Sequence, residues 1–252
     1  MSDIRTAVIT GAGSGIGLAC VERLLSDGFR VIALGRRKAI LEESLSKITC
    51  PTGRLIPIAA DVRDRKGLYN TLSDIGPIHA LAACAGVCER TYLKDNDNDA
   101  VWDNVIETNV TGVWNTFRAV QSLIVNGGSA AVVSSGLGKL GRPGYGAYAA
   151  SKHAVLGMVK CFALELAAKN IRVNAVCPGW VDTEMAARDL EITARETGKT
   201  VEQARNTATA GIPLKRFVTA EEVASLISWL LSDEASAVTG QSYNISCGEF
   251  TL

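Results

Sequence analysis

The sequence predicts a single α/β domain in which a doubly wound parallel sheet of about seven strands carries helices on both faces. Short β-rich runs alternate with longer helical stretches along nearly all of the 252 residues. The runs are apolar at successive positions, which is typical of parallel strands buried on both faces and joined by right-handed helical crossovers. No repeat or Pro/Gly/Ser-rich linker interrupts this alternation, so residues 1–252 are expected to form one domain.

Each expected element follows from a local pattern. In chain order, the expected strands are residues 6–10, 31–34, 55–60, 78–84, 130–134, 172–177 and 242–245. Pro57 weakens the third strand, because proline cannot donate to a sheet. The expected helices include residues 16–26, 41–48, 101–125 and 148–168. Residues 184–213 are polar with weak helical periodicity, which predicts a lid over the site or, alternatively, an exposed pair of surface helices.

The composition is that of a compact domain without a strong electrostatic preference for a partner. Lys and Arg total 26, Asp and Glu also total 26, and hydrophobic residues make up 47% of the chain. The balanced charge argues against general attraction to nucleic acid or to an anionic membrane. No apolar run reaches the roughly 18 residues of a membrane-spanning helix.

Cysteine and histidine usage indicates the compartment and argues against a metal. The seven cysteines are odd in number, form no C-x-x-C pair and lie mostly in apolar runs. This pattern indicates reduced thiols that serve as small core residues. The first residues show no basic segment followed by an apolar one, so no signal peptide is expected and the predicted location is cytoplasmic. With two histidines in the chain, no metal site is expected.

A glycine-rich turn follows the first expected strand and opens the first helix. Its sequence is Thr10-Gly11-Ala12-Gly13-Ser14-Gly15-Ile16-Gly17. Glycine lets the backbone turn tightly and approach a pyrophosphate, which then lies at the positive end of a helix. A simple tight turn is the alternative, but the position between strand and helix favours dinucleotide binding. The expected contact residues are Gly11, Ser14, Gly15, Ile16 and Gly17.

Tyr148 and Lys152 are four residues apart in a stretch expected to be helical, so both side chains share one helical face. A free tyrosine has a pKa of about 10, and lowering it by about three units corresponds to roughly 4 kcal/mol. A neighbouring ammonium favours the phenolate. The pair therefore predicts a proton donor and acceptor for a carbonyl–alcohol couple, although alone it is also typical of a helix surface. Tyr145 is the competing phenol, but its i+4 residue is Ala149.

In order and spacing, these motifs resemble the short-chain dehydrogenase/reductase (SDR) family. The expected lid, together with residues 213–217, 221–224 and 239–241, is similar to the corresponding part of ketoacyl and polyketide ketoreductases. The resemblance to the SDR family spans essentially the whole chain and includes Cys84-Ala85-Gly86, Asn109, Ser134-Ser135, Tyr148 with Lys152, and Pro178-Gly179 followed by Thr183. Ser135 lies thirteen residues before Tyr148, the interval usual in the family, which favours it over Ser134. The resemblance implies a Rossmann-like fold and the catalytic residues Asn109, Ser135, Tyr148 and Lys152.

The resemblance also implies a role for each of these residues. Hydride passes from nicotinamide to a substrate carbonyl carbon, while Tyr148 donates the proton and Ser135 hydrogen-bonds the same oxygen. Lys152 lowers the pKa of Tyr148 and holds the nicotinamide ribose, and Asn109 positions a water that links Lys152 to solvent. The further expected cofactor contacts are Asp61, Val62, Cys84, Ala85, Gly86, Tyr148, Lys152, Pro178, Gly179, Val181 and Thr183. The expected substrate contacts are Ser135, Leu137, Tyr145 and Trp180.

The residues after the second strand indicate which nicotinamide cofactor binds. An acidic residue about twenty positions beyond the glycines usually holds the ribose 2′-OH of NAD. Here Gly35 stands in that place, followed by Arg36-Arg37. A guanidinium suits a 2′-phosphate, with the Ser14 hydroxyl in support, so NADP(H) is favoured over NAD(H) and Arg36 and Arg37 are expected contacts. The alternatives are stacking of arginine on adenine and a solvated helix start.

The predicted activity is the NADP(H)-dependent interconversion of a ketone and a secondary alcohol, with a 3-oxoacyl thioester among the candidate substrates. One alternative is an NAD-dependent dehydrogenase that oxidises a secondary alcohol or dihydrodiol, and a more remote one is a non-catalytic dinucleotide-binding partner subunit. The expected partners are a small-molecule carbonyl or alcohol substrate and copies of the same chain, because the resemblance implies a homotetramer or dimer. Nucleic acid and membrane are not expected partners.

Three features leave alternatives open. Cys84 replaces the asparagine common in the family and is expected to be buried in a strand with a structural role. Trp180 is expected either to line the substrate pocket or to pack under the lid. Scattered basic residues either form an entrance for a carrier-bound substrate or belong to a solvated face. These residues are Arg142, Lys199, Arg205, Lys215 and Arg216.

Overall fold

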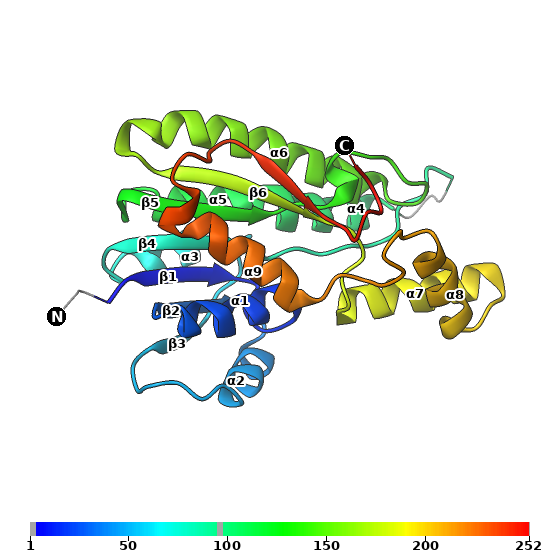
Figure 1. Cartoon of the computed structure of the whole chain (residues 1–252), viewed down its shortest axis with the longest axis horizontal. Coiled ribbons are helices and arrows are strands. Elements are labelled where there is room, and N and C mark those ends of the chain that lie inside the picture. Colours follow the sequence, from blue (N-terminus) through cyan, green and yellow to red (C-terminus); the bar gives the residue numbers. More distant parts are fainter. Residues whose placement is uncertain (1–3, 95–97, 252) are drawn as a thin grey trace.

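The computed structural model describes residues 4–94 and 98–251, and this part of the chain holds seven strands in one sheet (Figure 1). The strands are β1 (Thr6–Thr10), β2 (Arg30–Gly35), β3 (Leu55–Ala59), β4 (Ile78–Ala83), β5 (Ile124–Val133), β6 (Arg172–Pro178) and β7 (Ser242–Ile245). Their order is β3-β2-β1-β4-β5-β6-β7, and every neighbouring pair is parallel. The predicted fold class, a doubly wound Rossmann-like sheet, is confirmed.

The strand order locates the crevice in which a ligand of such a sheet binds. From β1 the chain moves outward through β2 to β3, and it then returns to place β4 on the other side of β1. At such a reversal the connections leave the sheet in opposite directions, which opens a crevice at the carboxyl ends of the strands. The residues that follow β1 and β4, including the glycine turn and Cys84-Ala85-Gly86, therefore share this edge.

Helices cover both faces of the sheet (Figure 1). They are α1 (Gly15–Ser26), α2 (Lys38–Ser46), α3 (Arg65–Leu72), α4 (Asp99–Ile106), α5 (Gly112–Val120), α6 (Gly146–Leu166), α7 (Glu184–Thr197), α8 (Val201–Ala210) and α9 (Ala220–Leu231). Successive strand residues alternate between two hydrophobic cores, since Ile9 packs with α1, α2 and α9 while Val8 packs with α3, α5 and α6. The unbroken apolar strands of the sequence are thus explained by burial on both faces.

The largest differences from the predicted element boundaries lie between residues 120 and 130. β5 begins at Ile124, so the expected helix over residues 101–125 ends at Val120, and the strand starts six residues earlier than expected. Asn126 and two glycines interrupt the apolar pattern there, and the pairing with β4 shifts register between Ile78 and Ala80. β3 does form across Pro57, because β3 is an edge strand and needs no donor on its outer side.

Residues 184–213 are mostly helical despite their polar sequence. Figure 1 shows α7 and α8 standing off the sheet, beyond the carboxyl ends of its strands. Thr200 begins α8 with a capping box, and Gly198 ends α7 with a φ of +65°. The two helices share a small core made of Leu190, Ala194, Ala204, Ile212 and Phe217. A role as a lid stays a prediction.

The cysteines are more varied in burial than the sequence predicts. All seven are free, but only Cys20 and Cys177 are buried, while Cys161 is exposed on α6. Cys84 and Cys247 are half-buried and pack against a core, so the expectation of core cysteines is clearly wrong only for Cys161, which lies on the outward face of its helix. No helix in the described residues is long and apolar enough to span a membrane. The expectation of no signal peptide was based on the first residues of the chain, of which residues 1–3 lie outside the described part.

Candidate functional site

The glycine turn brings three distant segments together. Gly11 has a φ of +68°, and a Cβ there would lie 2.9 Å from the backbone of Ala85, so the turn packs directly on the segment that follows β4. A Cβ at Gly15 would lie 3.2 Å from Cγ2 of Thr183, which leads into α7. The predicted cofactor contacts from residues 11–17, 84–86 and 178–183 therefore meet at one edge of the sheet.

The first turn of α1 is arranged to receive an anion. Ser14 is the N-cap residue, but its side chain accepts no hydrogen bond from the helix. The first N–H groups of a helix need partners, and an uncapped N-terminus behind a glycine turn suits a phosphate. Ile16 is half-buried against the core, and Gly17 is buried and packs against the backbone of Gly11.

The carboxyl end of β2 carries a cluster of arginines. Gly35 ends β2, and Arg36 and Arg37 after it are exposed. Arg63 pairs with Asp61 at 2.7 Å, and this hydrogen-bonded pairing, together with the charge of Arg36, lowers the pKa of Asp61. Since Asp61 is engaged by Arg63, this edge presents mainly positive charge. We did not predict Arg63 from the sequence, although its position two residues beyond Asp61 was a signal.

Val62 and Cys84, two of the expected cofactor contacts, differ in burial. Val62 is buried, packs on Gly112 and has its carbonyl held by the amide of Asn115 at 2.9 Å. Cys84 lies one residue beyond β4 and is half-buried, with its sulfur 4.0 Å from that of Cys20. The expectation that Cys84 lies buried within a strand is therefore wrong, because β4 ends at Ala83 where its pairing with β1 stops.

Asn109 lies in a π-helical turn, residues 107–111, that joins α4 to α5. Its buried amide donates to the carbonyl of Val87 at 2.9 Å and to Ser151 Oγ at 3.0 Å, and it accepts from the N–H of Val87 at 2.8 Å. A Cβ at Gly86 would lie 3.3 Å from Asn109 Oδ1 and 3.4 Å from Lys152 Nζ. Asn109 and Lys152 thus flank Gly86, and Val87 and Ser151 are supporting residues that the sequence did not indicate.

The two serines after β5 face different surroundings. Ser134 is buried and donates its hydroxyl hydrogen bond to the carbonyl of Lys152 at 3.0 Å. Ser135 is half-buried, accepts a hydrogen bond from the N–H of Leu137 at 3.1 Å, and interacts with the phenol of Tyr148. Ser134 therefore attaches the strand end to α6, and the Ser135 hydroxyl is the one placed beside Tyr148.

Tyr148 and Lys152 lie one turn apart near the start of α6. Lys152 Nζ donates to the carbonyl of Val133 at 2.9 Å and lies 5.6 Å from the centroid of the Tyr148 ring. Burial raises the pKa of Tyr148 above its ordinary value, while the hydrogen bond with Ser135 lowers it in part. Burial also lowers the pKa of Lys152 to about 8.

A role of Lys152 in lowering the pKa of Tyr148 stays a prediction. The ammonium is held by Val133 over the face of the ring, and removal of the phenol from water dominates. A phenol with a raised pKa stays protonated near neutral pH. This arrangement suits donation of a proton to a developing alkoxide.

A pocket of about 460 Å³ adjoins these residues, and we call it the α7–α8 pocket. It is lined by Arg90, Arg142, Pro143, Tyr145, Trp180, Leu190, Thr193, Thr197, Lys199, Ala204, Thr207, Ala208, Gly211 and Glu249. Tyr145 donates to Asp189 at 2.6 Å, and Arg90 binds the other oxygen of Asp189 at 2.9 Å. Trp180 lines this pocket and stacks on Phe217 with ring centroids 5.2 Å apart, and its predicted role at the substrate stays a prediction.

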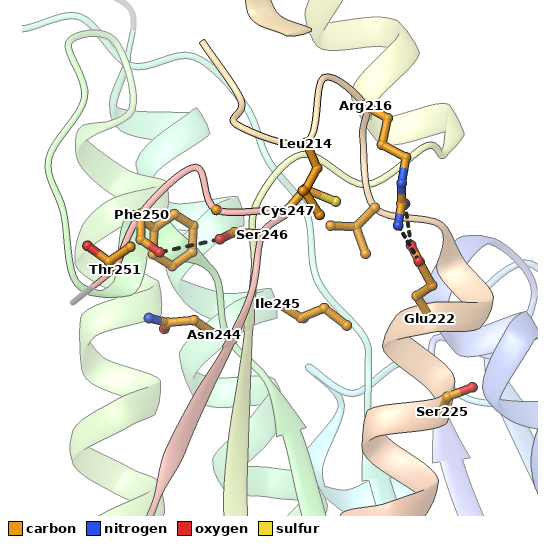
Figure 2. Close-up of a pocket in the computed structure, with 12 residues that line it drawn as sticks. Leu214, Arg216, Glu222, Ser225, Asn244, Ile245, Ser246, Cys247, Phe250 and Thr251 are labelled. Carbon is orange, nitrogen blue, oxygen red and sulfur yellow. Dashed lines mark hydrogen bonds and ion pairs between the residues drawn. The ribbon is translucent and has the colours of Figure 1, made fainter.

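A second pocket, of about 660 Å³, lies at the carboxyl end of β7 and contains none of the predicted site residues (Figure 2). Figure 2 shows Arg216 and Glu222 facing each other across its rim, paired at 2.6 Å. Phe250 forms the opposite wall, and its ring lies against Gly136. The α7–α8 pocket is the candidate substrate site, because Tyr145 and Trp180 line it and Tyr145 directly precedes α6, which carries Tyr148.

Comparison with known proteins gives consistent results. A family described as enoyl-(acyl carrier protein) reductase matches residues 11–249. The chain is 39% identical to the 3-oxoacyl-(acyl-carrier-protein) reductase FabG of Thermotoga maritima over 97% of both chains, and 34% identical to a putative ketoacyl reductase of Streptomyces coelicolor over 98% of this chain and 97% of the relative. A crystal structure of an actinorhodin polyketide ketoreductase variant with NADPH matches with a TM-score of 0.93 and 33% identity, covering 100% of this chain and 99% of the other.

Proposed function

Because this chain belongs to the short-chain dehydrogenase/reductase family and is an oxidoreductase acting on C=O and CH–OH groups, we propose that it reduces a ketone with NADPH through Tyr148. A relative is named a 3-oxoacyl-(acyl-carrier-protein) reductase, and this name favours a 3-oxoacyl thioester as the substrate of this chain. The observation that carries the proposal is the group of Ser135, Tyr148 and Lys152, in which a protonated phenol lies beside a hydroxyl and over an anchored ammonium.

The residues of the glycine turn fit the cofactor. Gly11 lets the turn pack directly on the backbone of Ala85, and α1 offers an uncapped N-terminus for a pyrophosphate. NADPH, when bound, supplies hydride to the substrate carbonyl carbon. Gly11, Ser14, Gly15, Ile16 and Gly17 would hold its pyrophosphate. Asp61, Val62, Ala85, Gly86 and Thr183 would surround the remainder, with Cys84, Pro178, Gly179 and Val181 behind them.

The protein's own groups then handle the proton. Tyr148 donates it to the substrate oxygen, and Ser135 stabilises the same oxygen with a hydrogen bond. Lys152 stabilises the phenolate left after this transfer, because its positive charge lies 5.6 Å from the ring centroid. The side-chain amide of Asn109 is fully used by Val87 and Ser151, so a relay water would be held by the backbone of the π-helical turn.

NADP(H) specificity rests on the end of β2. Arg36 and Arg37 are exposed after Gly35, and Arg63 engages the carboxylate of Asp61. A 2′-phosphate placed there would meet guanidinium groups with unused donors. A relative of similar fold was crystallised with NADPH, which supports the same choice.

The test is a Tyr148→Phe variant, with Tyr145→Phe as the matched control. We expect Tyr148→Phe to lower kcat for ketone reduction by about 10²- to 10⁴-fold while the Kd for NADPH stays within threefold. Tyr145→Phe should retain turnover, because the hydroxyl of Tyr145 is engaged by Asp189. If Tyr148→Phe keeps a tenth or more of the rate, another group donates the proton.

We also propose that the chain assembles as a homotetramer or dimer through α4, α5 and α6. Trp102, Trp114 and Leu164 are large apolar side chains exposed on these helices, with Leu164 81% exposed. Exposed apolar groups of this size commonly mark an interface. Sedimentation of a Leu164→Glu variant should show a smaller species than the wild type; an unchanged distribution would place the interface elsewhere.

A cytoplasmic location is proposed from the thiols. The seven cysteines form no disulfide within the described chain, although Cys20 and Cys84 approach to 4.0 Å. Thiols at this spacing persist in a reducing compartment. Isolation under thiol-blocking conditions should yield all seven cysteines in the reduced form, and a native disulfide would contradict this location.

A further inference from the structure

Five basic residues were candidates for contact with a charged substrate, and the structure separates them by their partners. Arg205 is paired with Asp182 at 2.8 Å and Arg216 with Glu222 at 2.6 Å. Lys215 donates to the carbonyl of Ala210 at 2.7 Å. These three side chains are satisfied by local groups. Arg142 and Lys199 differ from them because both line the α7–α8 pocket.

Arg142 has no hydrogen-bond acceptor and no carboxylate partner for its guanidinium within residues 4–94 and 98–251. Its Cζ instead lies 5.5 Å from the Trp180 ring centroid and 5.7 Å from that of Tyr145. Contacts with ring faces orient a guanidinium without using its N–H donors. Arg142 is thus held at the pocket with its donors directed to no group of the described chain.

The remaining polar groups of the pocket are largely engaged. Arg90 is bound by Asp189, Thr193 and Glu196. Thr193 and Thr197 donate to carbonyls of α7, and Thr207 donates to one of α8. Lys199 reaches only Thr207, at 3.5 Å.

Glu249 also lines the pocket, and its single negative charge does not neutralise both Arg142 and Lys199. Glu249 accepts the backbone N–H of Trp180 at 3.2 Å, which fixes its position beside the α7–α8 pocket. Arg90 is balanced by its own acidic partners. With Asp189 and Glu196 included the charges around the pocket balance, but neither Arg142 nor Lys199 has an acidic partner within the described residues.

The pocket also adjoins the reacting groups. Tyr145 lies in its wall and precedes Tyr148 by three residues at the start of α6. Asp189, bound to Tyr145, is close enough to Tyr148 to act on it electrostatically. A ligand that extends from the carbonyl site into the pocket would therefore reach Arg142.

We propose that the α7–α8 pocket binds an anionic group on the substrate, a carboxylate or a phosphate distal to the ketone, with Arg142 as its principal contact and Lys199 in support. This inference rests on the proposed reduction of a ketone at Tyr148. A planar guanidinium binds either anion with two parallel hydrogen bonds. The same chemistry is offered by a free keto acid and by the phosphate of a pantetheine arm.

The first experiment compares paired substrates in NADPH-dependent reduction. A medium-length keto acid is measured against its methyl ester, and a 3-oxoacyl pantetheine thioester is measured with and without its 4′-phosphate. We expect Arg142→Gln to raise KM tenfold or more, about 1.4 kcal/mol, for at least one anionic substrate. KM for its neutral partner should change less than twofold, and kcat should not change. The affected pair identifies whether the acid or the pantetheine phosphate is recognised.

The matched control is Arg188→Gln, which removes the same charge from an exposed position of α7 where Arg188 pairs with Glu184. It should leave both members of each substrate pair unchanged. Lys199→Gln should produce a smaller rise in KM than Arg142→Gln. If Arg142→Gln affects charged and neutral partners equally, or affects neither pair, the proposed anion site is wrong.

A binding measurement separates this inference from the proposed function. Glutarate and inorganic phosphate are titrated calorimetrically into the NADPH complexes of the wild type, Arg142→Gln and Arg188→Gln, and no turnover is required. Binding of either anion that weakens tenfold only in Arg142→Gln supports the pocket even if no ketone is reduced. Equal binding by all three proteins would overturn the anion site, whereas a failure of ketone reduction alone would overturn only the proposed function.

Discussion

Gly35→Asp tests the source of cofactor specificity with little disturbance to the fold. Gly35 ends β2 next to Arg36, and a Cβ added there would lie 3.2 Å from Cδ1 of Leu41. That atom is the far end of a flexible side chain, so a shift of a few tenths of an ångström accommodates the substitution. The new carboxylate would stand beside Arg36, where it would both compete for the guanidinium and repel a phosphate.

The magnitude follows from these two effects. A charge-assisted hydrogen bond between arginine and phosphate contributes about 1.5–3 kcal/mol. Repulsion between the carboxylate and the phosphate at an exposed site adds about 1 kcal/mol. A loss of about 2–4 kcal/mol weakens NADPH binding roughly 30- to 1,000-fold. NADH lacks the phosphate, and its ribose hydroxyls can donate to the carboxylate, so its Kd should stay unchanged or improve.

The assay is a fluorescence titration of NADPH and NADH at fixed salt, with Gly35→Asn as the isosteric neutral control. Gly35→Asn meets the same Leu41 contact, so any effect that it shares with Gly35→Asp is steric. Equal weakening of both cofactors by Gly35→Asp would show a distorted β2 end. Unchanged NADPH binding would show that Arg36 does not hold the phosphate.

Three further substitutions test other parts of the structure. Lys152→Met should abolish turnover yet raise the free energy of unfolding by about 2 kcal/mol at pH 7. The burial that lowers the pKa of Lys152 from 10.5 to about 8 costs the wild type about 3 kcal/mol, and the lost bond to Val133 offsets about 1 kcal/mol of the gain. In urea unfolding this gain should shrink between pH 8 and 10.5, and a constant gain would contradict a charged buried lysine. Glu222→Gln should cost about 0.5 kcal/mol at pH 7, since its half-exposed pair with Arg216 is screened. The pairing lowers the pKa of Glu222 to about 2, so the wild type loses this contribution only as the pH falls from about 4.5 through 2, and thermal unfolding that showed the loss near pH 6 would refute it. Asn115→Ala should lower the free energy of unfolding by about 2–3 kcal/mol, because the buried carbonyl of Val62 loses its hydrogen-bond donor. The affinity for NADPH should fall as well. Unchanged urea unfolding would show that water replaces the amide.

Much of the sheet was predictable because the relevant signals are local. A strand buried on both faces needs apolar residues at successive positions, and all seven expected strands are present. The pairing of Tyr148 with Lys152 follows from helical geometry over four residues. The expected helix into residues 121–125 was wrong, because nothing local reveals that β5 continues through Asn126 and two glycines with a shift in register.

The sequence alone determined which residues are available for the site: a glycine turn after β1, a serine after β5, and a tyrosine and lysine one helical turn apart. Only the tertiary structure decided their environment. The strand order brings Arg90 to Asp189, 99 residues away, and attaches Asn109 to Val87. It also removes the Tyr148 phenol from water, which raises the pKa of that group. Spacing along the chain specifies which groups are neighbours on one element, whereas the pKa of a group depends on the water removed from it by every element packed around it.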